Sequence, residues 1–111
     1  MFSGYGDGYV AVNGRHHEKN VAVTPTRVYA DWTAASFDTL SEADFAFIAG
    51  LEVDIALLGT GKTLRFPPSA LLRPLAGTRC GLEVMDMAAA CRTYNILAAE
   101  GRKVGAFILF D

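Results

Sequence analysis

The sequence predicts a mixed α/β fold in which helices pack on a β-sheet and an N-terminal β ribbon adds a further layer. Three largely apolar runs, at residues 53–59, 81–86 and 103–111, are typical of strands covered on both faces. Helical patterns lie between these runs, so right-handed crossovers and parallel strand pairs are expected. The chain has 111 residues, the size of one domain, and we expect a single domain over residues 1–111.

The first thirty residues predict the ribbon. YVAV at 9–12 and VAVTP at 21–25 are short β-branched runs, and the stretch between them contains Asn13-Gly14. Asn-Gly between such runs is a hairpin signal, so we expect these two strands to pair. A third short strand is expected at 27–30.

Helix boundaries are marked by capping and breaking residues. Ser41 followed by Asp44 resembles a capping box, and Gly50 is a plausible end of that helix. Pro67-Pro68 opens a short helix whose length Pro74 limits. Asp86 is expected to cap a longer helix that ends at Gly101.

Charge and hydropathy exclude several classes of protein. Twelve acidic residues against ten basic ones argue against nucleic-acid binding. No apolar run is long enough to span a membrane, and no export signal is recognisable, so a cytoplasmic location is expected. Residues 1–61 hold three basic and eight acidic residues, whereas residues 62–103 hold seven and three. The basic half favours a small anion or an acidic partner surface, and dispersed solvated charges explain it equally well.

The stretch GTGKT at 59–63 resembles the end of a nucleotide-binding phosphate loop. Such a loop requires an earlier glycine where this chain has Ala56, and it requires a long helix that starts at the lysine. Pro67-Pro68 follows too soon for that helix. We therefore interpret Gly59 and Gly61 as a sharp turn that leads into an edge segment at 62–66, and nucleotide hydrolysis is not expected.

Other reactive side chains have structural explanations. Cys91 falls on the apolar face of the helix that follows Asp86, where a small buried hydrophobic residue is expected rather than a redox or catalytic thiol. His16 and His17 would point to opposite faces of a strand, so no metal site is predicted. Ile96 lies opposite the apolar face, which predicts a second covered surface from the ribbon or from a partner subunit. No cofactor and no catalytic residues are predicted.

GTGKTLRFP at 59–67, followed by GLEVMDMAAACRTYNILAAEGRKVGAFI at 81–108, resembles the Mth938-like proteins, a domain of unknown function. The similarity covers residues 45–110, and the N-terminal ribbon fits less closely. It implies a three-layer fold of a mixed sheet, a β ribbon and helices. It also implies relatives that include a mitochondrial assembly factor for respiratory complex I, and no established reaction. Met87 departs from the family, whose members often have threonine there.

Ligands of parallel α/β sheets bind beyond the carboxyl ends of the strands, where the glycine turn and Asp86 are expected to face each other. The candidate ligand or partner site consists of Gly59, Thr60, Gly61, Asp86, Arg92, Thr93, Asn95 and Arg102. The leading hypothesis is a non-catalytic binding or assembly factor that acts on other proteins, among them respiratory or membrane complexes. The alternative is a small-anion-binding protein or small enzyme with a pocket between the glycine turn and the helix. A homodimer is a further possibility for the partner.

Overall fold

A five-stranded mixed sheet forms the centre of the molecule, with strand order β5-β4-β8-β6-β7. The computed structural model describes residues 1–110. The strands of this sheet are β4 (Val21–Val23), β5 (Val28–Ala30), β6 (Ile55–Gly59), β7 (Gly81–Met85) and β8 (Val104–Ile108). β6 is parallel to both β7 and β8, whereas β4 is antiparallel to β5 and β8. The mixed sheet and the parallel pairs predicted from the sequence are confirmed.

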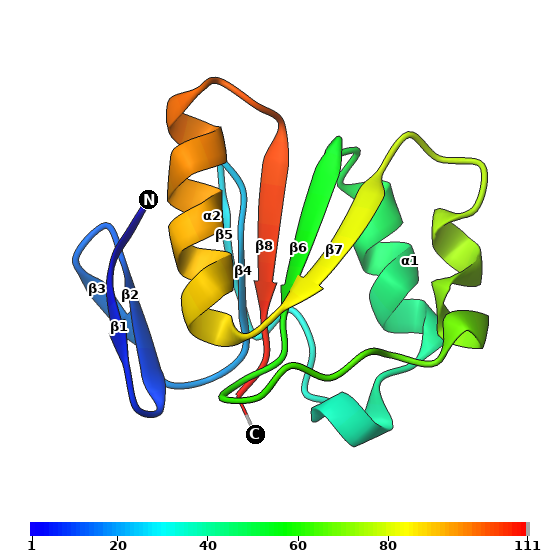
Figure 1. Cartoon of the computed structure of the whole chain (residues 1–111), viewed down its shortest axis with the longest axis horizontal. Helices are drawn as coiled ribbons and strands as arrows, with labels where there is room; N and C mark the ends of the chain where they lie inside the picture. The colour runs from blue at the N-terminus through cyan, green and yellow to red at the C-terminus, as the bar shows by residue number, and fades with distance from the viewer. Residues whose placement is uncertain (111) are drawn as a thin grey trace.

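Alternating side chains divide the core into two layers, one on each face of the sheet. Leu57 of β6 packs with α2 (Met87–Ala99), while its neighbours Ala56 and Leu58 pack with α1 (Glu42–Gly50). The period of two in each strand therefore supplies apolar side chains to both faces. Figure 1 shows α2 and the N-terminal ribbon on one side of the sheet and α1 on the other.

The predicted capping residues begin both α-helices. The amide of Ser41 donates to a carboxylate oxygen of Asp44 at 2.9 Å before α1, and the carboxylate of Asp86 accepts from the amide of Ala89 at 2.8 Å before α2. The segment after Pro68 is a 3₁₀-helix, η2 (Ser69–Leu75), and a shorter one, η1 (Phe37–Thr39), precedes α1. Within residues 1–110, no helix is long and apolar enough to cross a membrane.

The N-terminal ribbon is a three-stranded antiparallel sheet of β1 (Phe2–Gly6), β2 (Tyr9–Val12) and β3 (Arg15–His17). The predicted pairing of 9–12 with 21–25 was wrong. Asn13 and Gly14 both have positive φ, so they reverse the chain in two residues and pair β2 with β3 at once. β4 then pairs with β5 and β8 in the central sheet.

The remaining expectations concern the segment after the glycine turn, the last strand and the short helix after Pro68. Residues 62–66, expected as an edge segment after the glycine turn, form turn and irregular chain that follows β6. The last strand was predicted over 103–111, and it ends at Ile108; position 111 lies outside the described residues. The 3₁₀ geometry of η2 agrees with the short helix expected between Pro68 and Pro74.

Candidate functional site

The glycine turn closes β6 against the start of α2. Gly59, the last residue of β6, is buried, and a Cβ atom there would lie 3.0 Å from Ile108 Cδ1 and 3.1 Å from Ala90 Cβ. Gly61 has φ of 83°, a conformation that favours glycine. The two glycines thus have separate roles, since Gly59 permits close packing and Gly61 permits the turn.

Backbone hydrogen bonds join the glycine turn directly to α2. The amide of Met87 donates to the carbonyl oxygen of Gly61 at 2.8 Å, and the amide of Thr60 donates to the carbonyl oxygen of Met85 at 2.9 Å. The turn and the helix therefore face each other, as the sequence predicted, at hydrogen-bonding distance. Thr60 Oγ1 also lies near the Met85 carbonyl oxygen, at 3.4 Å.

A hollow of about 320 Å³ lies beside this junction, with the tip of the ribbon as its far wall. Gly61, Asp86 and Met87 line one side, and Tyr5 and Asp7 line the other. Lys62 Nζ and Asp7 Oδ1 are 3.4 Å apart across the hollow, and both side chains are exposed. An anion here would meet the Asp86 carboxylate, which already accepts from the first turn of α2. This chemistry disfavours an anion at this position.

Thr60 organises the loop that follows the turn. Its side chain is fully buried, and Oγ1 donates to the carbonyl oxygen of Thr63 at 2.6 Å while accepting from the amide of Arg65 at 3.1 Å. Arg65 Nη2 donates in turn to the carbonyl oxygen of Thr60 at 3.0 Å. The Arg65 guanidinium also lies 4.6 Å from the centre of the Phe37 ring. The loop is therefore held in one shape by several contacts.

This fixed loop exposes two large apolar side chains. Leu64 is 51% exposed and Phe66 is 70% exposed, on either side of the partly buried Arg65. Alternation along an extended segment explains the pattern, because Arg65 points inward and its neighbours point outward. We call Leu64 and Phe66 the loop surface. Sequence reasoning did not single out these residues, although the Leu-Arg-Phe alternation before Pro67 was the available signal.

Asn95 holds the ribbon on α2. Its Nδ2 donates to the carbonyl oxygen of Phe2 at 2.7 Å, and its Oδ1 accepts from the amide of the same residue at 2.8 Å. The side-chain amide thus mimics one rung of a β ladder, and Phe2 packs edge-on against Tyr94 with ring centres 5.4 Å apart. Asn95 was placed in the candidate ligand or partner site; the structure shows its contact with the ribbon, and a role toward a partner stays a prediction.

The other α2 residues singled out from the sequence differ in their exposure. Arg92 is exposed, and its Nη1 donates to the hydroxyl of Tyr5 at 3.1 Å, which raises the pKa of Arg92. Thr93, the next residue along α2, is partly buried. Ile96 is 60% exposed, so the ribbon does not cover it, contrary to one of the two expectations for this residue.

Arg102 lies at the other edge of the sheet. Arg102 follows α2 and comes just before Val104, the first residue of β8. Val104 pairs with Ile55 at the start of β6, whereas Gly59 lies at the end of that strand. The 13 residues of α2 span about 20 Å, so the helix carries the chain back across the sheet. The structure brings together Gly59, Thr60, Gly61 and Asp86, and separates Arg102 from them.

Other reactive groups are inaccessible or dispersed. Burial raises the pKa of the Cys91 thiol to about 12, so very little reactive thiolate forms at neutral pH. Within residues 1–110, no three His, Cys, Asp or Glu side chains gather in a way that could hold a metal ion. His16 Nδ1 lies 3.9 Å from Glu18 on the exposed ribbon.

Fold and site together define a small three-layer α/β domain whose glycine turn is joined to a capped helix and followed by an exposed apolar loop. The family model described as a protein of unknown function (DUF498/DUF598) matches residues 2–109, and the chain belongs to this family.

Solved structures confirm the fold predicted from the resemblance. A crystal structure of a Bordetella parapertussis protein is 35% identical, with a TM-score of 0.91 over 100% of this chain and 95% of that chain. A solution structure from Bordetella pertussis, described as a Mth938-like domain, is 29% identical with a TM-score of 0.84, covering 98% of this chain and 84% of that chain.

The chain is also similar to bovine NADH dehydrogenase (ubiquinone) 1 alpha subcomplex assembly factor 3. The two are 34% identical over 105 residues, which cover 92% of this chain and 55% of the bovine protein. The chain therefore spans about half the length of this relative.

Proposed function

We propose that the protein is a non-catalytic binding factor that contacts other proteins while a larger complex is assembled. The observation that carries this proposal is the loop surface, where two large apolar side chains are exposed on a loop fixed by Thr60 and Arg65. The name of the bovine relative, an assembly factor, supports the same class of function.

The energetics of the loop surface suit protein binding. Fully burying a leucine or phenylalanine side chain contributes roughly 1.5–3 kcal/mol, so Leu64 and Phe66 can form the centre of an interface. The hydrogen bonds of Thr60 fix the loop before any partner arrives. A fixed loop loses little conformational entropy on binding, so more of the burial energy appears as affinity.

We propose that the partners are protein subunits of a respiratory or other membrane complex, and that the protein binds them on the cytoplasmic side of the membrane. The bovine relative is named for assembly of NADH dehydrogenase, which supports this choice. Lys62, adjacent to the loop surface, is exposed, and its ion pair with Asp7 is exposed as well and therefore weak. A carboxylate of the partner can replace Asp7, so a partner with an acidic rim around an apolar centre is expected.

Affinity capture tests the proposal. The wild-type protein and the double variant Leu64→Ser/Phe66→Ser are used as baits in native lysate of the source cells, and captured proteins are identified by mass spectrometry. The wild type should capture subunits of a membrane-associated complex, and the double variant should lose them with its melting temperature unchanged. The matched control is Ile96→Ser, which removes an equally exposed apolar side chain from α2.

Two further arms define the surface and the partner. Arg92→Ala tests whether the site predicted from the sequence extends along α2, in which case capture weakens. Light scattering of the purified protein tests whether the partner is a second copy of the chain. Equal capture by the wild type and the double variant would refute the role of the loop surface.

A further inference from the structure

A second hollow, of about 440 Å³, lies at the edge of the sheet opposite the glycine turn. Three chain reversals surround it: the β4–β5 turn at 24–27, the α1–β6 connection at 51–53, and the α2–β8 connection at 101–103. The volume is in the range of small-molecule sites, roughly 300–1,000 Å³. No residue of the loop surface lines this hollow.

Backbone hydrogen bonds fix each of the three walls. The amide of Thr24 donates to the carbonyl oxygen of Arg27 at 2.8 Å, which closes the first reversal. The amide of Arg102 donates to the Leu97 carbonyl oxygen at 3.0 Å, and the Lys103 carbonyl oxygen accepts from the amides of residues 54 and 55 at 2.8 and 3.2 Å. The hollow is thus formed before a ligand enters it.

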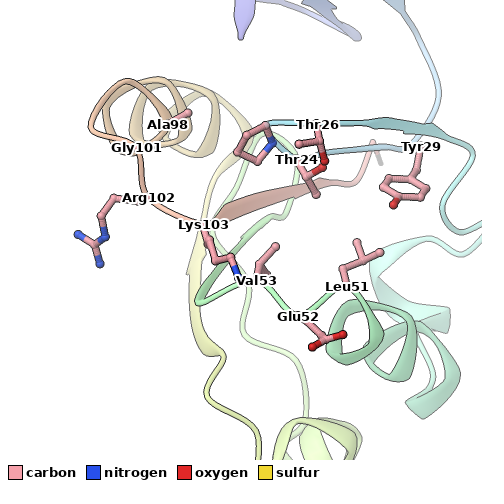
Figure 2. Close-up of a pocket in the computed structure, with 11 residues that line it drawn as sticks. Thr24, Thr26, Tyr29, Leu51, Glu52, Val53, Ala98, Gly101, Arg102 and Lys103 are labelled. Carbon is pink, nitrogen blue, oxygen red and sulfur yellow. The ribbon is translucent and has the colours of Figure 1, made fainter.

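Apolar side chains make up the centre of the hollow. Figure 2 shows Leu51 and Val53 beneath the β4–β5 turn, with the Tyr29 ring beside them. The Tyr29 ring is fixed by edge-on contact with Phe47, with centres 5.3 Å apart. A ligand here would therefore bury an apolar body against a rigid surface.

Two cations, Lys103 and Arg102, and one carboxylate, Glu52, line the hollow. The Lys103 side chain lies next to Val53 in Figure 2, whereas the side chains of Arg102 and Glu52 extend outward on different sides. Lys103 forms no ion pair within residues 1–110. Thr26, which also lines the hollow, carries a hydroxyl on the exposed β4–β5 turn.

We propose that this hollow binds a small amphipathic carboxylate, with its apolar body on Leu51 and Val53 and its carboxylate at Lys103. A compact ammonium group matches a single carboxylate. Of the other nearby cations, Arg102 extends away from the hollow, and Arg27 lies over the Tyr29 ring with its Cζ atom 5.0 Å from the ring centre. Lys103 is therefore the cation that we assign to the ligand. The proposal goes beyond the protein-binding function and does not depend on the loop surface.

Three probes with the same eight-carbon body separate charge from apolar burial. Octanoate, octanol and octylammonium, each below its micelle concentration, are titrated into the ¹⁵N-labelled full chain while amide chemical shifts are followed. Octanoate should shift the amides of Thr26, Val53 and Lys103 and bind about tenfold more tightly than octanol. Octylammonium should bind more weakly than octanol.

A charge reversal tests the role of Lys103. Lys103→Glu should weaken octanoate at least about tenfold and make octylammonium the better ligand of the two. Lys62→Glu is the matched control, because it reverses an exposed lysine at the opposite edge of the sheet and should leave octanoate binding unchanged. Lys103→Gln, a milder change, should weaken octanoate without favouring octylammonium.

Several outcomes would overturn the proposal. Equal affinity for octanol and octanoate in the wild type would show that no carboxylate is recognised. A neighbouring hollow of about 360 Å³ shares Lys103 and is lined by Arg79 and Cys80, so shifts confined to those two residues would place the ligand there instead. Loss of octanoate binding in Lys62→Glu would show that reversing any exposed lysine weakens octanoate, and that Lys103 has no specific role. The comparison of the three probes uses the wild-type protein alone, so it holds even if a variant fails to fold.

Discussion

The amide nitrogen of Met87 lies 2.8 Å from the carbonyl oxygen of Gly61, so the first residue of α2 is hydrogen-bonded to the turn that ends β6. Thr60 lies between two such links, since its amide donates to Met85 and its hydroxyl to Thr63. The turn, the start of α2 and the exposed loop therefore behave as one rigid unit. A change at the turn is expected to reach the loop surface through Thr60.

Gly59→Ala should destabilise the protein by about 1–3 kcal/mol. The new methyl group would lie 3.0 Å from Ile108 Cδ1 and 3.3 Å from the Met87 Cα, and buried neighbours yield only with strain. Urea unfolding measures the change. Gly50→Ala is the matched control, because nothing lies within 4 Å of a Cβ there, and its stability should be unchanged or slightly higher. Equal stability of the two variants would contradict the close packing at Gly59.

Asp86→Ala should lower the free energy of unfolding by about 1 kcal/mol, because α2 loses the carboxylate that accepts from the amide of Ala89. Asp86→Asn retains a capping oxygen and should restore most of the loss. Thermal and urea unfolding of the three proteins check the order. If the asparagine variant were as unstable as the alanine variant, the charge of Asp86 rather than its hydrogen bond would be the stabilising feature.

The central sheet and α2 could be predicted because their signals are local. Apolar runs mark β6 and β8, and Asp86 and Gly101 bracket α2 as capping residues do. The ribbon pairing was wrong because Arg15–His17, a polar stretch, forms a strand only through its register with β2. β2 and β3 pair because Asn13 and Gly14 form a two-residue turn between them, and the side-chain pattern of β3 does not reveal that turn.

The candidate site was predicted in part. Gly59, Thr60, Gly61 and Asp86 do come together, since strand ends and helix starts share one edge of the sheet. Arg102 was grouped with them although a helix of 13 residues must carry it to the opposite edge. The exposure of Leu64 and Phe66 depends on Arg65 pointing inward to Thr60, a tertiary contact that the sequence does not show.

Asn95→Ala should destabilise the ribbon in particular. The variant leaves the amide and carbonyl groups of Phe2 without their partner, and Phe2 is nearly buried, so a loss of about 1–3 kcal/mol is expected. Hydrogen exchange should speed up at the Phe2 amide more than in β6 or β8. Thr93→Ala, on the other flank of α2, is the control and should leave exchange at Phe2 unchanged. Uniform faster exchange through the whole domain would instead indicate global destabilisation.

Stability should decline at alkaline pH because α2 buries two weakly acidic side chains, Cys91 and Tyr94. Burial raises the pKa of Cys91 from 9.0 to about 12 and that of Tyr94 from 10.0 to about 12. The unfolded chain therefore releases these protons at lower pH than the native protein does. The contribution of these two groups to stability is fully present below pH 9. It is lost as the pH rises from 9 towards 12, so the free energy of unfolding should fall over that range.

A double variant isolates this contribution from that of the lysines, which titrate in the same range. Cys91→Ala/Tyr94→Phe removes both groups, so its free energy of unfolding should change less between pH 8 and 11 than that of the wild type. Urea unfolding at several pH values gives both curves, and their difference cancels the groups that the two proteins share. Parallel curves would show that Cys91 and Tyr94 ionise equally easily in the native and unfolded states, against the burial seen for both side chains.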